Sequence, residues 1–152
     1  MHRKVKFIVA SFCLLPFFVL SEAEAFNGCN QFSVYFQNET PFDCNVVDSK
    51  LHHGFWVTPP IKGTAPDTLY TAAQSFYGPD AEVTLSCGND AKGYYKFTVR
   101  NQQNFCFLAG GDQKNTVVSQ DKGINVTNVM AHRASFMEDT PGIARVTVTT
   151  SP

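Results

Sequence analysis

Two runs of alternating side chains constrain the fold of this chain more than any other feature of its sequence. They occupy residues 81–87 (AEVTLSC) and 94–100 (YYKFTVR), and the turn-forming stretch GNDAKG lies between them. A period of two residues is typical of a β-strand that buries one face. Glycine, asparagine and aspartate favour the tight turn that joins two antiparallel strands. The sequence therefore predicts an antiparallel hairpin over residues 81–100.

The rest of the chain also reads as strands and turns. No segment shows sustained apolar spacing of three and four residues, so long amphipathic helices are not expected. Short strands with frequent turn signals are typical of a β-sandwich. We expect an all-β, single-domain antiparallel β-sandwich of roughly eight or nine strands, stapled by disulfides. The additional strands are expected at residues 33–37, 42–47, 68–75, 105–108, 116–119, 124–130 and 143–149, and the core at Val34, Phe36, Val83, Leu85, Phe97, Val99 and Val146.

Residues 1–25 have the form of a secretory signal peptide. A basic start is followed by an apolar run over residues 7–20 and by a small-residue cleavage site, Ala23-Glu24-Ala25. The run is short for a membrane span and a cleavage site follows it, so we interpret it as a signal and not as an anchor. Cleavage leaves residues 26–152 as the β-sandwich domain. The protein is therefore expected to be secreted, either to the extracellular space or to a periplasm.

Four of the five cysteines lie in the expected mature chain. An even number of cysteines in a secreted protein indicates disulfides, and four cysteines allow three pairings. No pair has the C-x-x-C spacing of a zinc site, so a metal is not expected there. We predict two disulfides, with Cys44 to Cys87 and Cys29 to Cys106 as the preferred pairing, although the sequence supplies no strong physical ground for that choice.

Charge and hydropathy exclude two classes of partner. The signal peptide removes three basic and two acidic residues from totals of 12 and 13, which leaves a net charge of about −2. Because the chain has no basic stripe, nucleic acid is not an expected partner. Apart from the signal, no apolar run approaches the length of a transmembrane segment.

One segment, residues 49–61 (SKLHHGFWVTPPI), differs from ordinary scaffold sequence. It gathers two histidines, the only tryptophan, a phenylalanine and two prolines. The prolines exclude a central strand and favour an extended or turning loop. One interpretation is a contact surface, because amphipathic aromatic rings suit the boundary between water and a lipid headgroup or a sugar. The other is that the tryptophan anchors the core. The predicted binding residues are His53, Phe55, Trp56, Tyr70 and Tyr77.

No catalytic or cofactor signature accompanies these residues. No G-x-S-x-G motif occurs, and an even cysteine count leaves no free thiol for a Cys–His pair. Adjacent histidines in a strand point to opposite faces, so His52 and His53 do not form a metal site by themselves. We expect a protein that is not an enzyme and that uses neither a cofactor nor a metal.

Across residues 33–107 the chain resembles the aegerolysin-type β-sandwich proteins and the related small bacterial crystal-protein toxins. The resemblance rests on Leu51, on the G-x-W of residues 54–56 with Pro59-Pro60 after it, and on two strand motifs. These are GPDAEVT at residues 78–84 and FTVRN at residues 97–101. The family often has an aromatic residue where this chain has Leu85. The resemblance implies a small β-sandwich that binds membrane lipids, and some members act as cytolysins together with a second component.

The sequence thus favours a secreted, non-enzymatic binding protein. The first hypothesis is membrane-lipid binding of a toxin-like or cytolysin-like kind. The alternative is a secreted scaffold module that binds an extracellular protein or glycan and has no membrane activity. The histidine and aromatic residues of segment 49–61 carry the first hypothesis.

The signal and cysteine patterns give a first prediction. The secreted protein should begin at Phe26 and should lack four thiol hydrogens, because both cysteine pairs oxidise after export. Intact-mass measurement with and without reduction checks both points. Free thiols on two or more of these cysteines would contradict the prediction.

Overall fold

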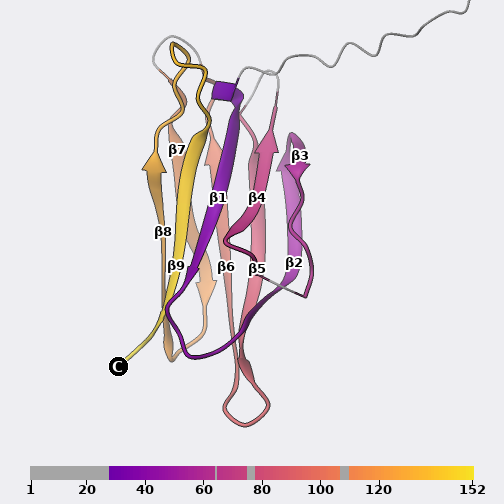
Figure 1. The fold of residues 1–152 in the computed structure, drawn as a ribbon, viewed down its shortest axis with the longest axis vertical. Coiled ribbons are helices and arrows are strands. Elements are labelled where there is room, and N and C mark those ends of the chain that lie inside the picture. The colour runs from indigo at the N-terminus through magenta and orange to yellow at the C-terminus, as the bar shows by residue number, and fades with distance from the viewer. Residues whose placement is uncertain (1–27, 64, 75–77, 107–109) are drawn as a thin grey trace, which may run out of the picture.

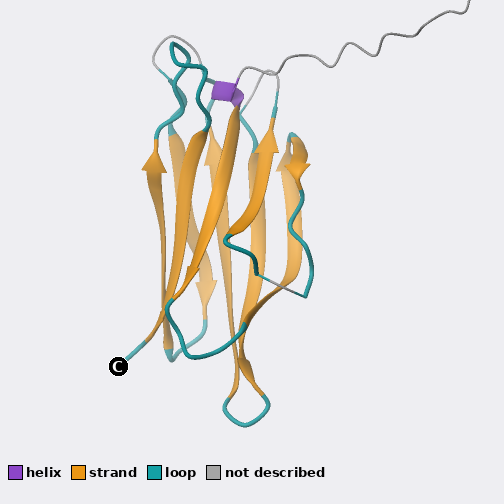
Figure 2. Ribbon diagram, in the orientation of Figure 1, coloured by secondary structure: helices purple, strands orange, loops and turns teal. Residues whose placement is uncertain are grey.

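The fold is a sandwich of two β-sheets, seen in a computed structural model that describes residues 28–63, 65–74, 78–106 and 110–152 (Figures 1 and 2). This confirms the all-β sandwich that the alternating pattern predicts. Within the described residues, a 3-10 turn, η1 (Gly28–Asn30), precedes nine strands. They are β1 (Gln31–Asn38), β2 (Cys44–His53), β3 (Phe55–Thr58), β4 (Thr68–Ala73), β5 (Asp80–Asn89), β6 (Gly93–Gln103), β7 (Gln113–Gln120), β8 (Ile124–His132) and β9 (Gly142–Thr150).

The strands divide between a five-stranded and a four-stranded sheet. The order in the larger sheet is β3-β4-β1-β9-β8 and the order in the smaller sheet is β2-β5-β6-β7. All neighbouring pairs are antiparallel except β1 and β9, which are parallel. The chain passes from one sheet to the other after β1, β2, β4 and β7, and the connections β2–β3 and β7–β8 are short and join edge strands. Both lateral edges of the sandwich are therefore turned by short connections.

The predicted hairpin is confirmed as β5 and β6. Val83 lies opposite Val99 and Leu85 lies opposite Phe97, so the apolar faces of the two strands coincide. Gly93 starts β6 with a φ of 85°, a value that glycine adopts without strain. In Figure 1 this hairpin extends past the other strands at one end of the sandwich.

The core lies between the sheets, and all seven of the predicted core residues are buried in it. The aromatic rings of Phe36 in the five-stranded sheet and Phe97 in the four-stranded sheet stack with centroids 6.3 Å apart. Alternate residues of the strands supply the remaining apolar contacts, as the two-residue period requires.

Both predicted disulfides are present, in the preferred pairing. Cys44 and Cys87 are directly opposite each other on β2 and β5, with their Cα atoms 4.0 Å apart. Cys29 and Cys106 join η1 to the segment after β6, where they form a small cluster with Ala134. One disulfide thus braces the four-stranded sheet, and the other ties the start of the domain to its loops.

Three local expectations were wrong. Residues 105 and 106 do not form a strand, because the chain leaves β6 there to reach the disulfide partner Cys29; residues 107–109 lie outside the described part. Strand β2 runs on to His53, beyond the expected end at residue 47. Strand β3 occupies part of a segment that was expected to be a loop. Among the described residues, no helix is long and apolar enough to cross a membrane.

The core arrangement predicts the effect of removing one ring. Phe97→Ala should lower the free energy of unfolding by about 3–5 kcal/mol, because a fully buried phenylalanine leaves a cavity when truncated. Val118→Ala, at an exposed site on the adjacent sheet edge, serves as the control and should change stability by less than about 0.5 kcal/mol. Urea unfolding of both variants checks this, and a similar cost for the two would contradict the placement of Phe97.

Candidate functional site

The segment singled out in the sequence forms the corner between the two sheets. β2 ends at His53, Gly54 turns the chain, and β3 continues as the edge strand of the five-stranded sheet. Gly54 has a φ of 98°, and a Cβ added there would lie 2.5 Å from the carbonyl oxygen of Ala73. Only glycine fits this corner without displacing backbone. The expected loop is therefore mostly strand, and the prolines follow at its end, where an edge strand tolerates them.

Large apolar side chains are exposed along this corner. Phe55, Val57 and Ile61 are 38%, 49% and 63% exposed, and Val47 of the adjacent strand β2 is 39% exposed. We call Val47, Phe55, Val57 and Ile61 the apolar edge. The stretch after Pro59-Pro60 is held against β2, because Gly63 N donates to Val46 O at 3.1 Å. The apolar edge is therefore backed by hydrogen-bonded backbone on both sides of the prolines.

Trp56 combines features of both interpretations of the sequence, a surface residue and an anchor of the core. Its side chain is half-buried and packs against the core. The indole meets the ring of Tyr70 edge-on, with centroids 5.2 Å apart and planes at 78°, a favourable arrangement for aromatic pairs. Trp56 thus borders the surface while it also contributes to the core.

Tyr70 does not line the surface, and that prediction was wrong. Its side chain is fully buried, because residue 70 falls on the inward face of β4. The ring of Tyr70 instead packs against Trp56 from the core side. Its hydroxyl donates a hydrogen bond to Asn101 Oδ1 at 2.9 Å. Burial, and to a lesser degree the negative charge of Asp80, raises the pKa of Tyr70 well above its ordinary value. Tyr77 lies outside the described residues.

His53 is exposed and also lines a pocket of about 340 Å³, in which several polar side chains meet a mainly apolar lining. The pocket lies where β2 and β6 end and β5 begins, opposite to the tip of the β5–β6 hairpin (Figure 1). We call the residues around it the polar pocket; they are His53, Gly78, Asp80, Gln102, Gln103, Asn104 and Phe105.

Asp80, which lines the polar pocket, forms an ion pair with Arg100. Both carboxylate oxygens of Asp80 accept from Arg100, Nε to Oδ1 at 2.9 Å and Nη2 to Oδ2 at 2.6 Å. The Asp80 side chain is 3% exposed, whereas that of Arg100 is 39% exposed. This two-point geometry is the most directional contact that an arginine makes with a carboxylate. Asp80 is thus held in one position, and the guanidinium keeps a solvent-facing part.

Sequence reasoning missed Asp80, Arg100 and Gln102. Asp80 lies just before the alternating run of residues 81–87, and the alternation of residues 94–100 was used only to find the buried face. The same alternation places Arg100 and Glu82 on the outward face, so an acid and a base opposite each other were available as a signal. That signal predicts an ion pair between Glu82 and Arg100 on the surface. It does not reveal that the side chain of Asp80 is buried.

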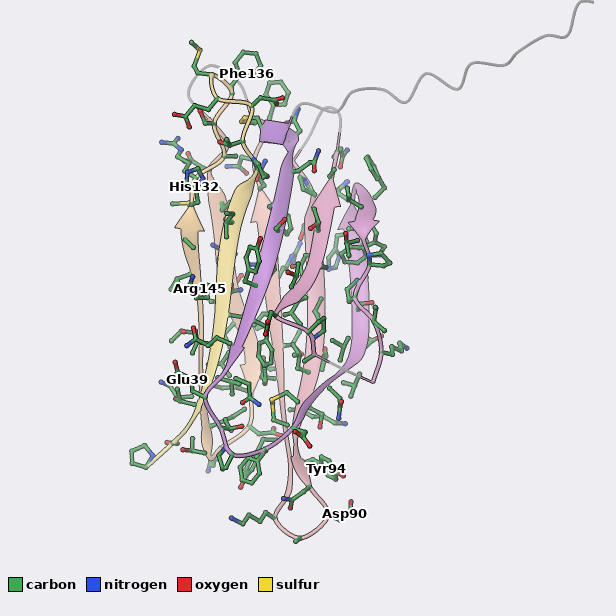
Figure 3. The ribbon with its side chains drawn as sticks, viewed as in Figure 1. Glu39, Asp90, Tyr94, His132, Phe136 and Arg145 are labelled. Atoms are coloured by element: carbon green, nitrogen blue, oxygen red, sulfur yellow. A yellow bond between two sulfur atoms is a disulfide. The ribbon has the colours of Figure 1, made fainter. Side chains whose placement is uncertain are left out.

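Polar groups gather at other places in the described residues as well, among them a hollow of about 400 Å³ lined by Asn38, Asp43 and Asn45. His52 Nε2 lies 3.7 Å from Glu82 Oε2 on the outer face of the smaller sheet. Across the described ranges, no group of three or more histidine, cysteine, aspartate and glutamate side chains could hold a metal ion. His132 and Phe136, which Figure 3 labels near one end of the sandwich, line another hollow of about 260 Å³. Tyr94 and Asp90 lie at the opposite end (Figure 3) and share a 2.9 Å hydrogen bond, which raises the pKa of Tyr94.

The chain was compared with known proteins in three ways. No protein-family model, no curated protein and no solved structure matches it. The family resemblance drawn from the sequence therefore stays a prediction, and the geometry of the site has to support any function by itself.

The buried phenol of Tyr70 predicts a dependence of stability on pH. An unfolded tyrosine ionises near pH 10.0, whereas the folded side chain stays neutral to higher pH. The unfolded state then binds fewer protons, so stability is complete below pH 10.0 and falls above it, by about 1.4 kcal/mol per pH unit. Tyr70→Phe removes the ionisable group, so the slope above that pH should become shallower by this amount. Urea unfolding of both proteins over a pH series measures the slopes, and equal slopes would refute the assignment.

Proposed function

We propose that this protein is a secreted, non-enzymatic binding protein that attaches to membrane lipid through its apolar edge. The observation that carries the proposal is the exposure of three large apolar side chains within one short segment, Phe55 and Val57 on the edge strand β3 and Ile61 in the chain that follows it. Isolated exposed apolar residues are ordinary, but several large ones within one short edge segment favour an interaction surface.

The energetics of this surface suit a lipid interface. The net charge of the expected mature chain is only about −2, so long-range attraction supplies little of the binding energy. Transfer of apolar area from water gives about 25 cal/mol per Å², and fully burying one large aliphatic or aromatic side chain gives about 1.5–3 kcal/mol. Three such side chains supply enough free energy for reversible membrane attachment.

The edge is also stiff, which favours binding. β3 pairs with β4, and the prolines and the contact of Gly63 with β2 restrict the chain that follows. A surface that is already ordered loses little conformational entropy when it binds. Trp56 and His53 flank the apolar side chains and bring amphipathic groups to the depth of lipid headgroups.

The resemblance to aegerolysin-type proteins points in the same direction, since its G-x-W and Pro-Pro motif forms this corner. It is an additional reason for choosing lipid over another apolar partner. The alternative function, a scaffold for an extracellular protein or glycan, draws support from the polar pocket beside His53. Vesicle binding separates the two.

The test is co-sedimentation with vesicles of phosphatidylcholine, phosphatidylethanolamine or sphingomyelin, each with and without cholesterol. We expect binding to at least one composition. Val57→Ser with Ile61→Ser should weaken it about tenfold or more, because two exposed apolar side chains are removed from the contact.

The matched control is Val118→Ser with Val129→Ser. These two valines are 54% and 53% exposed on β7 and β8, at the other lateral edge of the sandwich. The control should bind like the unchanged protein. Absence of binding to every composition, or equal losses in the two double variants, would overturn the proposal and leave the scaffold function.

A further inference from the structure

The polar pocket lies on a face of the sandwich that would ordinarily face water. On β5 the side chains of Ala81, Val83 and Leu85 point into the core and are fully buried. Strand alternation therefore places Asp80 on the outer face of the smaller sheet. A two-layer sandwich has no third layer there, yet Asp80 is buried. Arg100 binds both of its carboxylate oxygens, and the segments that carry Gly78 and Asn104–Phe105 line the pocket together with it.

Polar side chains continue from the pocket across the whole sheet. Strand pairing places His53 beside Asp80, Asp80 beside Gln102, and Gln102 beside Lys114, in one row over β2, β5, β6 and β7. Four strands span about 14 Å at roughly 4.8 Å between neighbours. A smaller hollow of about 130 Å³ follows the pocket along this row and is lined by Arg100, Gln102, Lys114 and Thr116.

The groups along this row differ in charge from one end to the other. At the pocket end, the carboxylate of Asp80 is neutralised by Arg100, and the amides of Gln102 and Asn104 add donors and acceptors. Lys114 lies on β7, at the end of the row away from the pocket, and takes part in no salt bridge among the described residues. Lys114 and Arg100 line the same hollow. The charge of Arg100 is balanced by Asp80, and Glu82 lies opposite it on β5, so the positive charge left for a ligand at that end is that of Lys114.

We propose that the polar pocket binds a sugar residue that carries an acidic group. A sugar presents adjacent hydroxyls, each both donor and acceptor, and these match the planar amides of Gln102 and Asn104. The ring of Phe105, 44% exposed at the pocket wall, offers a flat apolar face for the C–H side of the sugar. The carboxylate or sulfate would lie toward Lys114, where a charge-assisted hydrogen bond is stronger than a neutral one.

A few convergent polar groups in a pocket above about 300 Å³ are typical of small-ligand sites. The proposal goes beyond membrane attachment and does not require it. His53 lines the pocket and is separated from Phe55 of the apolar edge by Gly54 alone, so the same sugar could be presented by a lipid headgroup or by a free glycan. The chemistry that the pocket recognises is the same in both cases.

The experiment is isothermal titration calorimetry of the disulfide-bonded mature protein with soluble saccharides. The probes are sialyllactose, a glucuronate-terminated disaccharide and a sulfated disaccharide, with lactose as the neutral counterpart. We expect at least one acidic probe to bind more tightly than lactose, and its binding to weaken with added salt. If no acidic probe binds better than lactose, the proposal is wrong.

Three variants locate the site. Lys114→Gln should weaken the acidic probe about tenfold and leave lactose unchanged, because it removes one charged hydrogen bond. Gln102→Ala should weaken both kinds of probe. Phe105→Leu should also weaken both, since it removes the flat ring but keeps an apolar side chain. Thermal unfolding of each variant verifies that the fold is intact.

The matched control is Lys96→Gln, which makes the same change of charge at an exposed position toward the other end of β6. It should leave the affinity unchanged, and an equal loss in Lys96→Gln and Lys114→Gln would overturn the proposal. The Val57→Ser with Ile61→Ser variant should keep full saccharide affinity, so failure of the sugar site and failure of membrane attachment are observed separately. Vesicles that carry the bound sugar on a lipid then show whether the headgroup or the free glycan is the better source.

Discussion

Hydrogen bonds between buried asparagine side chains, with Asn101 at their centre, join the two sheets of this protein. Asn101 of β6 accepts the Tyr70 hydroxyl at 2.9 Å and donates to the side-chain oxygens of Asn115 and Asn128, each at 2.9 Å. Tyr70 and Asn128 belong to the five-stranded sheet, whereas Asn101 and Asn115 belong to the four-stranded sheet. Apolar contacts between sheets tolerate some sliding, but hydrogen bonds in a low-dielectric interior do so only at the cost of unpaired polar groups. Asn101 therefore fixes how one sheet lies on the other.

The hydrogen bonds of Asn101 also influence the surface, because the residues beside this network contact surface side chains. Tyr70 packs against Trp56, so the inter-sheet network also positions the indole beside the apolar edge. Arg100 precedes Asn101 on β6 and therefore points to the opposite face, where it holds Asp80 in the polar pocket. Two consecutive residues of β6 therefore act on opposite faces: Arg100 positions Asp80 in the pocket, and Asn101 orders the interior. The apolar edge and the polar pocket are thus both held in place by this part of β6.

The fold was largely predictable because its main signals are local. Alternation in β5 and β6 identified the hairpin and its buried face, and the same pattern located all seven core residues. Strand β3 was not predicted, because two prolines follow it and because Gly54 makes its entry a corner between sheets. The preferred cysteine pairing is confirmed, although the sequence alone did not favour it strongly.

The candidate sites were predicted less well than the fold. Phe55 lies on the surface as expected and Trp56 borders it, but Tyr70 is buried, since its aromatic character says nothing about which face of β4 it occupies. Asp80 was missed for the complementary reason. Burial on the outer face of a sheet depends on contacts with residues that are distant in sequence, here the ion pair with Arg100, and no local pattern around Asp80 encodes it.

The parallel pairing of β1 and β9 has a consequence for how the molecule is made. Phe32 pairs with Gly142, so two central strands of the larger sheet come from nearly opposite ends of the domain. β1 cannot complete its hydrogen bonds until β9 has been synthesised and has reached it, and pairings so distant in sequence form slowly. A chain with this topology stays incompletely folded while it emerges. For a protein expected to cross a membrane unfolded before it oxidises its cysteines, late closure of the sheet keeps the chain competent for export.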